Sequence, residues 1–312
     1  MKSTTAKTSA QKQSKPTLWA DRVPLSWKPY VQLTRIDLFA GSLMIFWPYV
    51  WTLPLVRRDV LSHYSQYIPQ AGIWLVWSII LHSVGSTWND ICDVDFDRQV
   101  ERTKTRPLPS GAVSIRAAYL WMVPQIAILM GILFQFNIFT VQMGMVQMFV
   151  LTTIYPFAKR YTYIPQAWLG FTIGWGAIVA WSANSDRLNW EVVGLMLATV
   201  MIWVTYIDTF YAMLDKKDDA KAGVKSSALL FGDNARAILA FLATLFVGGM
   251  AKIGHLLGVN TAFYYVAVLG SALHFLWQLY TADFDDPKSC MMQFNSNLKS
   301  LGGLTMAGIL LG

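Results

Sequence analysis

The chain has 312 residues, of which 54% are hydrophobic and only 14% are charged. Soluble domains usually carry charge on roughly 25% of their residues, so this composition argues against a soluble globular protein. The net charge of +7 comes from basic residues in the loops between apolar segments. That placement is typical of membrane topology, and we expect no nucleic-acid partner.

The apolar residues form segments that are mostly about 18–25 residues long, which suits helices crossing a bilayer core of about 30 Å. Such segments must be helical, because lipid satisfies no backbone hydrogen bonds. The sequence therefore predicts an all-α membrane protein with about nine transmembrane helices in one bundle. The expected spans are 31–55, 71–92, 113–135, 139–157, 166–183, 189–212, 235–253, 261–281 and 294–312.

Residues 1–30 precede this membrane domain of residues 31–312. They include Lys2, Lys7, Lys12 and Lys15, with no acidic residue before Asp21. A signal peptide needs an apolar core, which this segment lacks. A mitochondrial presequence is an alternative, since the segment is rich in Ser and Thr, but it has almost no Arg and no clear amphipathic repeat. We expect a disordered tail on the cytosolic side.

An acidic cluster ends the second span. On a helix that turns about 100° per residue, Asn89, Asp93 and Asp97 lie within about 80° of arc. Asp90 falls between them.

A second acidic cluster ends the sixth span. Asp208, Asp215 and Asp219 lie within about 40° of arc on a helix, and Asp218 adjoins the last of them.

The two clusters could be solvated helix ends whose acids pair with nearby basic residues. Three observations favour a functional site. Each stripe continues an apolar span, where ionisable groups are costly. Acids at the C-terminal end of a helix also oppose its dipole, so a cation should compensate them. Finally, the pattern occurs twice on one membrane face. Oxygen-rich sites of this kind suit Mg²⁺, which bridges carboxylates to phosphates.

Basic residues accompany both clusters, and they would let a diphosphate bind beside the acids. Taken singly, most of them also fit ordinary positively charged loops. They are Arg98, Arg102, Lys104 and Arg106 after the first cluster, and Lys216, Lys217, Lys221 and Lys225 after the second.

The distribution of Lys and Arg predicts the orientation. With nine spans, all of these residues lie on the side of the N-terminus except Arg57, Arg58, Arg187 and Lys252. Positive residues favour the cytoplasmic face. The N-terminus and both acidic clusters are therefore expected to face the cytosol, or the matrix in a mitochondrion.

Three glycines of the fifth span and the two cysteines of the chain are expected to have structural roles only. Gly170, Gly174 and Gly176 are expected to permit close helix packing. Cys92 and Cys290 have neither metal-site spacing nor a disulfide framework, and we expect inert thiols.

At the acidic clusters the sequence resembles the UbiA superfamily of intramembrane aromatic prenyltransferases. Residues 89–98 fit the NDxxDxxxD motif of that family, and residues 102–111 look like its usual continuation. Residues 208–226 are similar to the second motif, and residues 155–160 to a third. The resemblance runs from about Tyr30 to the C-terminus.

The resemblance implies a nine-helix bundle around a central cavity that opens at the acidic loops. It implies ligands for Mg²⁺ ions on the diphosphate at Asn89, Asp93, Asp97, Asp215 and Asp219, supported by Asp90 and Asp218. It implies phosphate contacts from Arg102, Lys159 and Lys225. The residues expected near the prenyl cation or the acceptor are Asp208, Tyr155 and Arg35. The resemblance implies catalytic roles for six of these residues: Asp93, Asp97, Asp208, Asp215, Asp219 and Lys159.

The chain departs from the family pattern near the expected acceptor end. Leu38 and Phe39 stand where Lys-Pro is frequent, His82 stands where many members carry Arg, and Val94 where Arg is frequent. His82 is either a packed histidine or an acceptor contact. These departures concern the acceptor, and they leave the diphosphate chemistry intact.

The resemblance is strongest to fungal members that prenylate phenolic acids such as orsellinic acid, with farnesyl diphosphate as donor, in meroterpenoid biosynthesis. The expected membrane is then of the endoplasmic reticulum type, with the active site facing the cytosol. One alternative is a 4-hydroxybenzoate polyprenyltransferase of ubiquinone synthesis, with the mitochondrial inner membrane as the location. Others are a membrane-bound terpene cyclase and, from a different class, a cation transporter. Transporters tend to place acids mid-span, whereas these acids lie at helix ends.

Overall fold

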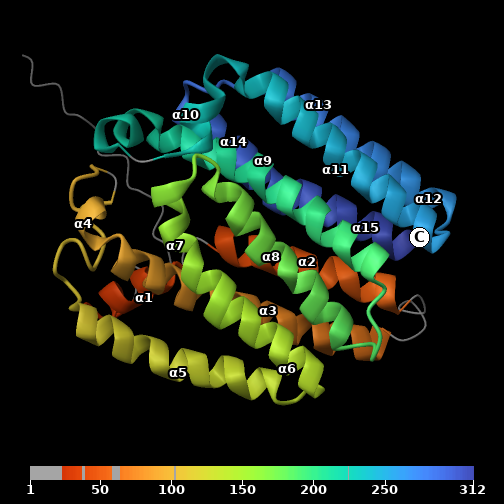
Figure 1. Cartoon of the computed structure of the whole chain (residues 1–312), viewed down its shortest axis with the longest axis horizontal. Helices are drawn as coiled ribbons and strands as arrows, with labels where there is room; N and C mark the ends of the chain where they lie inside the picture. Colours follow the sequence, from red (N-terminus) through yellow and green to blue (C-terminus); the bar gives the residue numbers. More distant parts are fainter. Residues whose placement is uncertain (1–22, 37–38, 58–63, 102, 224) are drawn as a thin grey trace, which may run out of the picture.

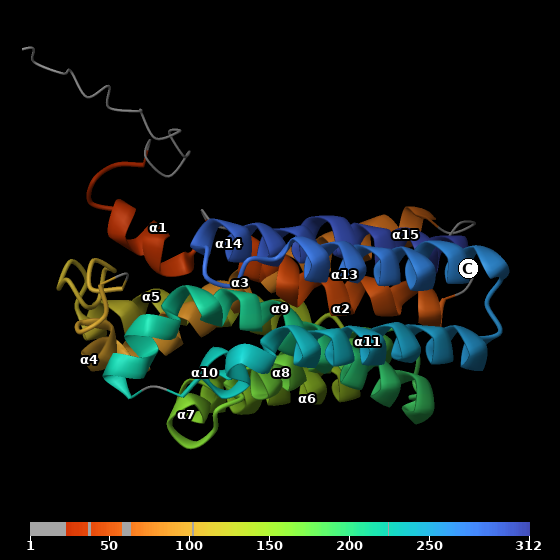
Figure 2. The same ribbon diagram turned by 90° about the horizontal axis from the view of Figure 1, so that it is seen from above.

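The computed structural model describes residues 23–36, 39–57, 64–101, 103–223 and 225–312. Within these ranges every regular element is a helix, as the apolar segments predict. The long helices run side by side along the long axis of the molecule (Figures 1 and 2). At one end of the bundle lie the short α4 (Val94–Asp97), α7 (Thr152–Tyr161) and α10 (Ser227–Phe231), and at the other end lies the C-terminus.

The first expected span, 31–55, is two helices, which corrects the sequence interpretation. Helix α1 covers Lys28–Thr34 and α2 covers Ala40–Val56. Arg35 ends α1 with a φ of 49°, and Phe39 precedes α2 with a φ of 51°. Both lie in the left-handed region, which side-chain-bearing residues rarely adopt. The predicted tail of residues 1–30 overlaps α1, and its first 22 residues lie outside the described ranges.

The remaining helices follow the other expected spans, with several π-helical turns inside them. In chain order they are α3 (Tyr64–Cys92), α4, α5 (Ile115–Leu133), α6 (Ile138–Met145), the π-helix η2 (Val146–Leu151), α7, α8 (Pro165–Ser182), α9 (Trp190–Ala222), α10, η3 (Gly232–Asn234), α11 (Ala235–Leu257), α12 (Thr261–Phe263), the π-helix η4 (Tyr264–Leu269), α13 (Gly270–Thr281), α14 (Pro287–Ser296), the π-helix η5 (Asn297–Leu301) and α15 (Gly302–Leu311).

Six helical segments of the described residues are long and apolar enough to cross a membrane, and α2 is apolar but shorter. The six are Ser65–Cys92, Ile115–Leu133, Ile138–Ala158, Trp190–Lys216, Ser227–Leu257 and Thr261–Thr281. Large apolar side chains such as Leu120 and Val123 on α5 and Leu273 and Leu276 on α13 are exposed. An exposed apolar surface of this kind suits contact with lipid. The count of nine spans stays a prediction.

Helix α9 packs closely against α8, and this contact sets the frame of the bundle. A Cβ atom on Gly170 would lie 2.6 Å from the carbonyl oxygen of Met201, and one on Gly174 would lie 2.8 Å from that of Leu197. Only glycine lets the two backbones approach so closely. The expected packing role of these glycines is confirmed. The core continues from α9 to α2, where the rings of Trp51 and Trp203 lie 5.1 Å apart.

Candidate active site

The residues of the first acidic cluster stay on one face although helix α3 ends within the cluster. Helix α3 ends at Cys92, but the amide of Asp93 still donates to the carbonyl of Asn89 at 2.9 Å, and that of Asp97 to Asp93 at 2.8 Å. This i to i−4 pattern keeps Asn89, Asp93 and Asp97 on one face. All three are at most 9% exposed and line a cavity of about 610 Å³.

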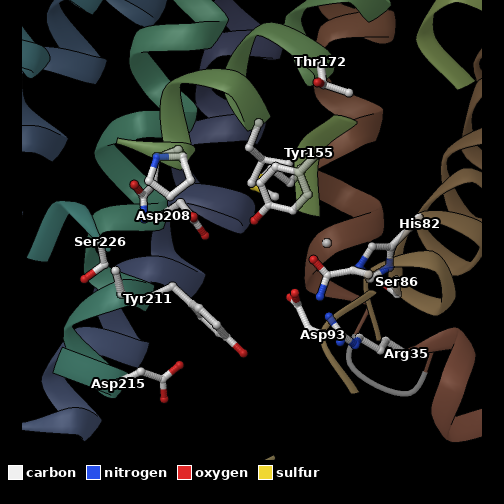
Figure 3. A pocket seen from close by; sticks show the side chains of 18 of the residues that line it. Arg35, His82, Ser86, Asp93, Tyr155, Thr172, Asp208, Tyr211, Asp215 and Ser226 are labelled. Carbon is white, nitrogen blue, oxygen red and sulfur yellow. The ribbon is translucent and has the colours of Figure 1, made fainter. Parts of the chain in front are cut away.

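The second stripe lines the same cavity from α9. Asp208, Asp215 and Asp219 all contribute to its wall, together with Tyr211. Figure 3 shows Asp208, Tyr211 and Asp215 on one side of the cavity, with Asp93, Arg35 and His82 on the other. The two clusters lie far apart in sequence and face each other across one space.

Asp90 lies in an ion-pair network behind this wall. Its carboxylate is 1% exposed and pairs with Arg35, and Arg106 Nη1 lies 3.3 Å from the same oxygen. Arg106 also bonds Asp97 at 3.0 Å. The network explains the left-handed Arg35, because that turn brings α1 back to α3. It joins α1, the end of α3 and the loop after α4.

Two further arginines line the cavity. Arg106 was named only among the basic residues after the first cluster, without a role of its own, and Arg160 was given no role. Arg160 donates to the carbonyl of Cys92 at 3.1 Å, and its guanidinium lies over the rings of Phe96 and Phe157. Both arginines stand inside the sequence motifs, Arg106 after the first cluster and Arg160 next to Lys159. Their position inside the motifs could have pointed to a role in the site, but arginines in ordinary membrane-protein loops occupy similar positions.

Of the three basic residues expected to contact phosphate, the structure describes the side chain of one, Lys225. Lys225 lines the cavity, donates to the carbonyl of Tyr161 at 3.4 Å, and lies over the ring of Tyr163. Arg102 lies outside the described residues, as do the side chains of Lys159 and Asp218. Lys225 therefore ties the loop after α9 to the loop after α7 at the mouth of the cavity.

The expected acceptor residues also line the cavity. His82 Nδ1 lies 3.2 Å from Ser42 Oγ, and the imidazole covers Gly41, where a Cβ atom would collide with it. Tyr155 lies in the middle of the cavity, across from Asp208 (Figure 3). His82 is thus both packed against α2 and present at the cavity wall.

The described residues contain no group of three Asp, Glu, His or Cys side chains close enough to hold a metal ion by themselves. However, Asn89 Oδ1 is buried and accepts no hydrogen bond from the described residues. A buried amide oxygen beside carboxylates is a suitable Mg²⁺ ligand, and Mg²⁺ is commonly held by one or two carboxylates plus substrate phosphates. Asn89 and the carboxylates around the cavity could therefore hold a Mg²⁺ ion that is also bound by the phosphates of a substrate.

Sequence comparison places this architecture among known proteins. Residues 45–301 match the UbiA prenyltransferase family. The chain is 40% identical to the UbiA prenyltransferase claS of Ampulloclitocybe clavipes over 91% of its own length and 90% of that protein. It is 35% identical to the mitochondrial 4-hydroxybenzoate polyprenyltransferase of Schizosaccharomyces pombe, covering 94% and 82%. It is 36% identical to 4-hydroxybenzoate geranyltransferase 2 of Lithospermum erythrorhizon, covering 96% of each chain.

Solved structures share the fold. A UbiA homolog from Aeropyrum pernix K1 superposes with a TM-score of 0.69 at 24% identity, covering 87% of this chain and 97% of that one. A UbiA homolog from Archaeoglobus fulgidus, bound to GPP and Mg²⁺, gives 0.64 at 16% identity, covering 90% and 99%.

Proposed function

Since this chain belongs to the UbiA prenyltransferase family and is thereby a multi-pass membrane transferase, we propose that it joins the prenyl group of a prenyl diphosphate to an aromatic phenolic acid. The observation that carries the proposal is the pair of acidic helix ends, Asn89–Asp97 and Asp208–Asp219, facing each other across one cavity. A diphosphate between them would be held from both sides.

The proposed metal ligands are Asn89, Asp93 and Asp97 on one side and Asp215 and Asp219 on the other, with Asp90 and Asp218 in support. When bound with the substrate, Mg²⁺ would neutralise the diphosphate and make it a better leaving group. The buried Asn89 Oδ1, which accepts no hydrogen bond from the part of the chain that the structure describes, supports this assignment.

Basic side chains at the mouth would bind the phosphate oxygens. Lys225, Arg106 and Arg160 line the cavity near the acids, and we add the two arginines to Arg102 and Lys159 as phosphate contacts. Charge-assisted hydrogen bonds from guanidinium groups stabilise the negative charge that grows as the carbon–oxygen bond of the donor breaks.

The chain's other cavity residues would guide the second half of the reaction. An aromatic ring carbon forms the new bond to the allylic carbon, and the ring then loses a proton to a base or to the released diphosphate. Tyr155 and Tyr211 present aromatic rings that can stabilise positive charge. The apolar lining from Met44, Ile45 and Leu81 keeps water away from the reactive carbon.

We propose farnesyl diphosphate as donor, a phenolic acid such as orsellinic acid as acceptor, and a meroterpenoid as product. The relative from Ampulloclitocybe clavipes supports this choice over the others. The alternative is 4-hydroxybenzoate with a polyprenyl donor, as in the name of the Schizosaccharomyces pombe relative. We place the chain in an endoplasmic-reticulum-type membrane with its site facing the cytosol. The mitochondrial inner membrane is the alternative.

The decisive experiment incubates membranes containing the protein with Mg²⁺, prenyl diphosphates of several lengths, and orsellinic acid or 4-hydroxybenzoate. We expect a product whose mass equals that of orsellinic acid plus a farnesyl group minus the ring hydrogen that it replaces. We expect no such product when EDTA removes the metal. A polyprenylated 4-hydroxybenzoate would favour the alternative. Ion flux in liposomes, without diphosphate release from any donor, would show that the chain is a cation transporter.

A further inference from the structure

The end of the cavity farthest from the acids, which we call its floor, lies about two helical turns below them along α3. Along α3 its lining runs from Asn89 to Leu81, a distance of about 12 Å at the rise of an α-helix. Thr172 on α8 lies at the end of the cavity away from Asp215 and Arg35 (Figure 3). One turn below Leu81, α3 carries Trp77, which is fully buried.

A chain of hydrogen bonds holds Gln147 in this floor. Gln147 lines the cavity and is 1% exposed. Its Oε1 accepts the hydroxyl hydrogen of Tyr49, whose oxygen in turn accepts a bond from Trp77 Nε1 at 2.6 Å. Its Nε2 donates to the carbonyl of Thr172 at 2.9 Å. Both ends of the amide are thus paired in an apolar interior, where an unpaired end would be costly. The side chain is fixed in place.

Aromatic packing makes the floor solid. The ring of Tyr49 stacks on Trp74 at 4.8 Å, and Trp74 stacks on Phe136 at 5.1 Å. A Cβ atom on Gly176 would lie 2.7 Å from the Tyr49 ring, so α8 presses directly on that ring. Side chains from α2 and α3 and the backbone of α8 therefore pack tightly behind Gln147 at this end of the cavity.

We propose that Gln147 is the residue that limits the length of the prenyl donor, so that the cavity selects short-chain prenyl diphosphates over long polyprenyl ones. This inference rests on the proposed function, because the acids at the mouth must hold the diphosphate for the tail to point at the floor. The selection is a matter of depth: a further isoprene unit would collide with a side chain that cannot swing away.

The test compares four variants. Gln147→Ala removes the floor side chain, and Gln147→Leu keeps its approximate volume while removing its hydrogen bonds. Ile173→Phe adds bulk at the same depth, beside Thr172 on α8. Gln166→Ala makes the same Gln-to-Ala change at the mouth end of α8, where the cavity wall also includes Gln166.

Each variant is given equal concentrations of geranyl, farnesyl and geranylgeranyl diphosphate with Mg²⁺ and the phenolic acceptor, and the products are quantified by mass spectrometry. We expect Gln147→Ala to raise the ratio of geranylgeranyl to farnesyl product roughly tenfold. Ile173→Phe should shift the products toward geranyl. Gln147→Leu, which keeps the bulk but loses the bonds that hold it, should raise the ratio less than Gln147→Ala. Gln166→Ala should leave the ratios unchanged, whatever it does to the overall rate.

A second readout does not depend on turnover. With Mg²⁺ and non-reactive thiolodiphosphate analogues of the three donors, the melting temperature of each purified variant reports which tail length binds best. The preferred length should increase for Gln147→Ala and decrease for Ile173→Phe. If neither variant changes the preferred length, the assignment of Gln147 is wrong. If the analogues bind as expected but no aromatic acceptor is prenylated, the proposed function is wrong, and the role of Gln147 in limiting tail length is retained.

Discussion

At the scale of single residues, position on a helix face separates the acids of the first cluster. Asp93 lines the cavity, whereas the side chain of Asp95 is 81% exposed and pairs with Arg98 outside it. Asp93→Ala or Asp215→Ala should abolish turnover, measured as diphosphate release, with the protein still inserted in the membrane. Asp95→Ala is the matched control and should retain activity. Near-normal Mg²⁺-dependent activity in either of the first two variants would refute the metal assignment.

A second residue prediction concerns Cys290, which lies outside the candidate spans. Burial, and next the nearby Asp283, raise the pKa of its thiol to about 11. The thiol is therefore protonated at neutral pH, and only the thiolate reacts readily. In a Cys92→Ser background, maleimide should label the folded protein slowly at pH 7, and faster as the pH rises toward 11. Detergent-denatured protein should label quickly at pH 7, and equally rapid labelling of the folded protein would contradict the prediction.

Residue-level periodicity predicted part of this site. The arcs of Asn89, Asp93 and Asp97 follow from the helical repeat, and the structure places all three on the cavity wall. The pairing of Asp90 with Arg35 joins residues far apart in the chain, so no local pattern could reveal it. Gln147 did carry a signal, as a polar residue inside an apolar span, but only the fold supplies Tyr49, Trp77 and Thr172 as its partners.

At the scale of helices, the close contact of α8 with α9 holds the second acidic stripe in place. Gly170→Ala should lower the melting temperature by several degrees, because its Cβ would meet the backbone of Met201 and overpacking typically costs about 1–3 kcal/mol. Gly131→Ala on α5 is the control. A Cβ there meets open space, and alanine favours a helix over glycine. Equal melting temperatures for the two variants would contradict this view of the contact.

The helix boundaries show how far the sequence pattern predicts the fold. Apolar length predicted most of the spans, because the bilayer imposes it. The split of the first span into α1 and α2 was missed, since both segments read as one apolar stretch. Arg35, which ends α1 in the left-handed region, pairs with the distant carboxylate of Asp90 on α3, and no local pattern predicts that contact.

For the whole molecule, the charge distribution predicts which face of the bundle meets the cytosol. Single cysteines placed at Glu101 and at Arg187, in a background without Cys92 and Cys290, should differ in their labelling by a membrane-impermeant maleimide. In sealed microsomes, whose cytosolic face is outside, only the position at Glu101 should label. Both should label after detergent opens the vesicles, and labelling of the Arg187 position alone in sealed vesicles would reverse the proposed orientation.

The π-helical turn η2 has a consequence for the phase of the helix that contains it. A π turn holds one residue more than an α turn, so every side chain after Val146–Leu151 is rotated relative to those of α6. Tyr155 and Arg160, which line the cavity, both follow that extra residue. Shortening this turn by one residue would restore a regular α-helix and turn both side chains by about 100°, away from the wall they now share with Gln147.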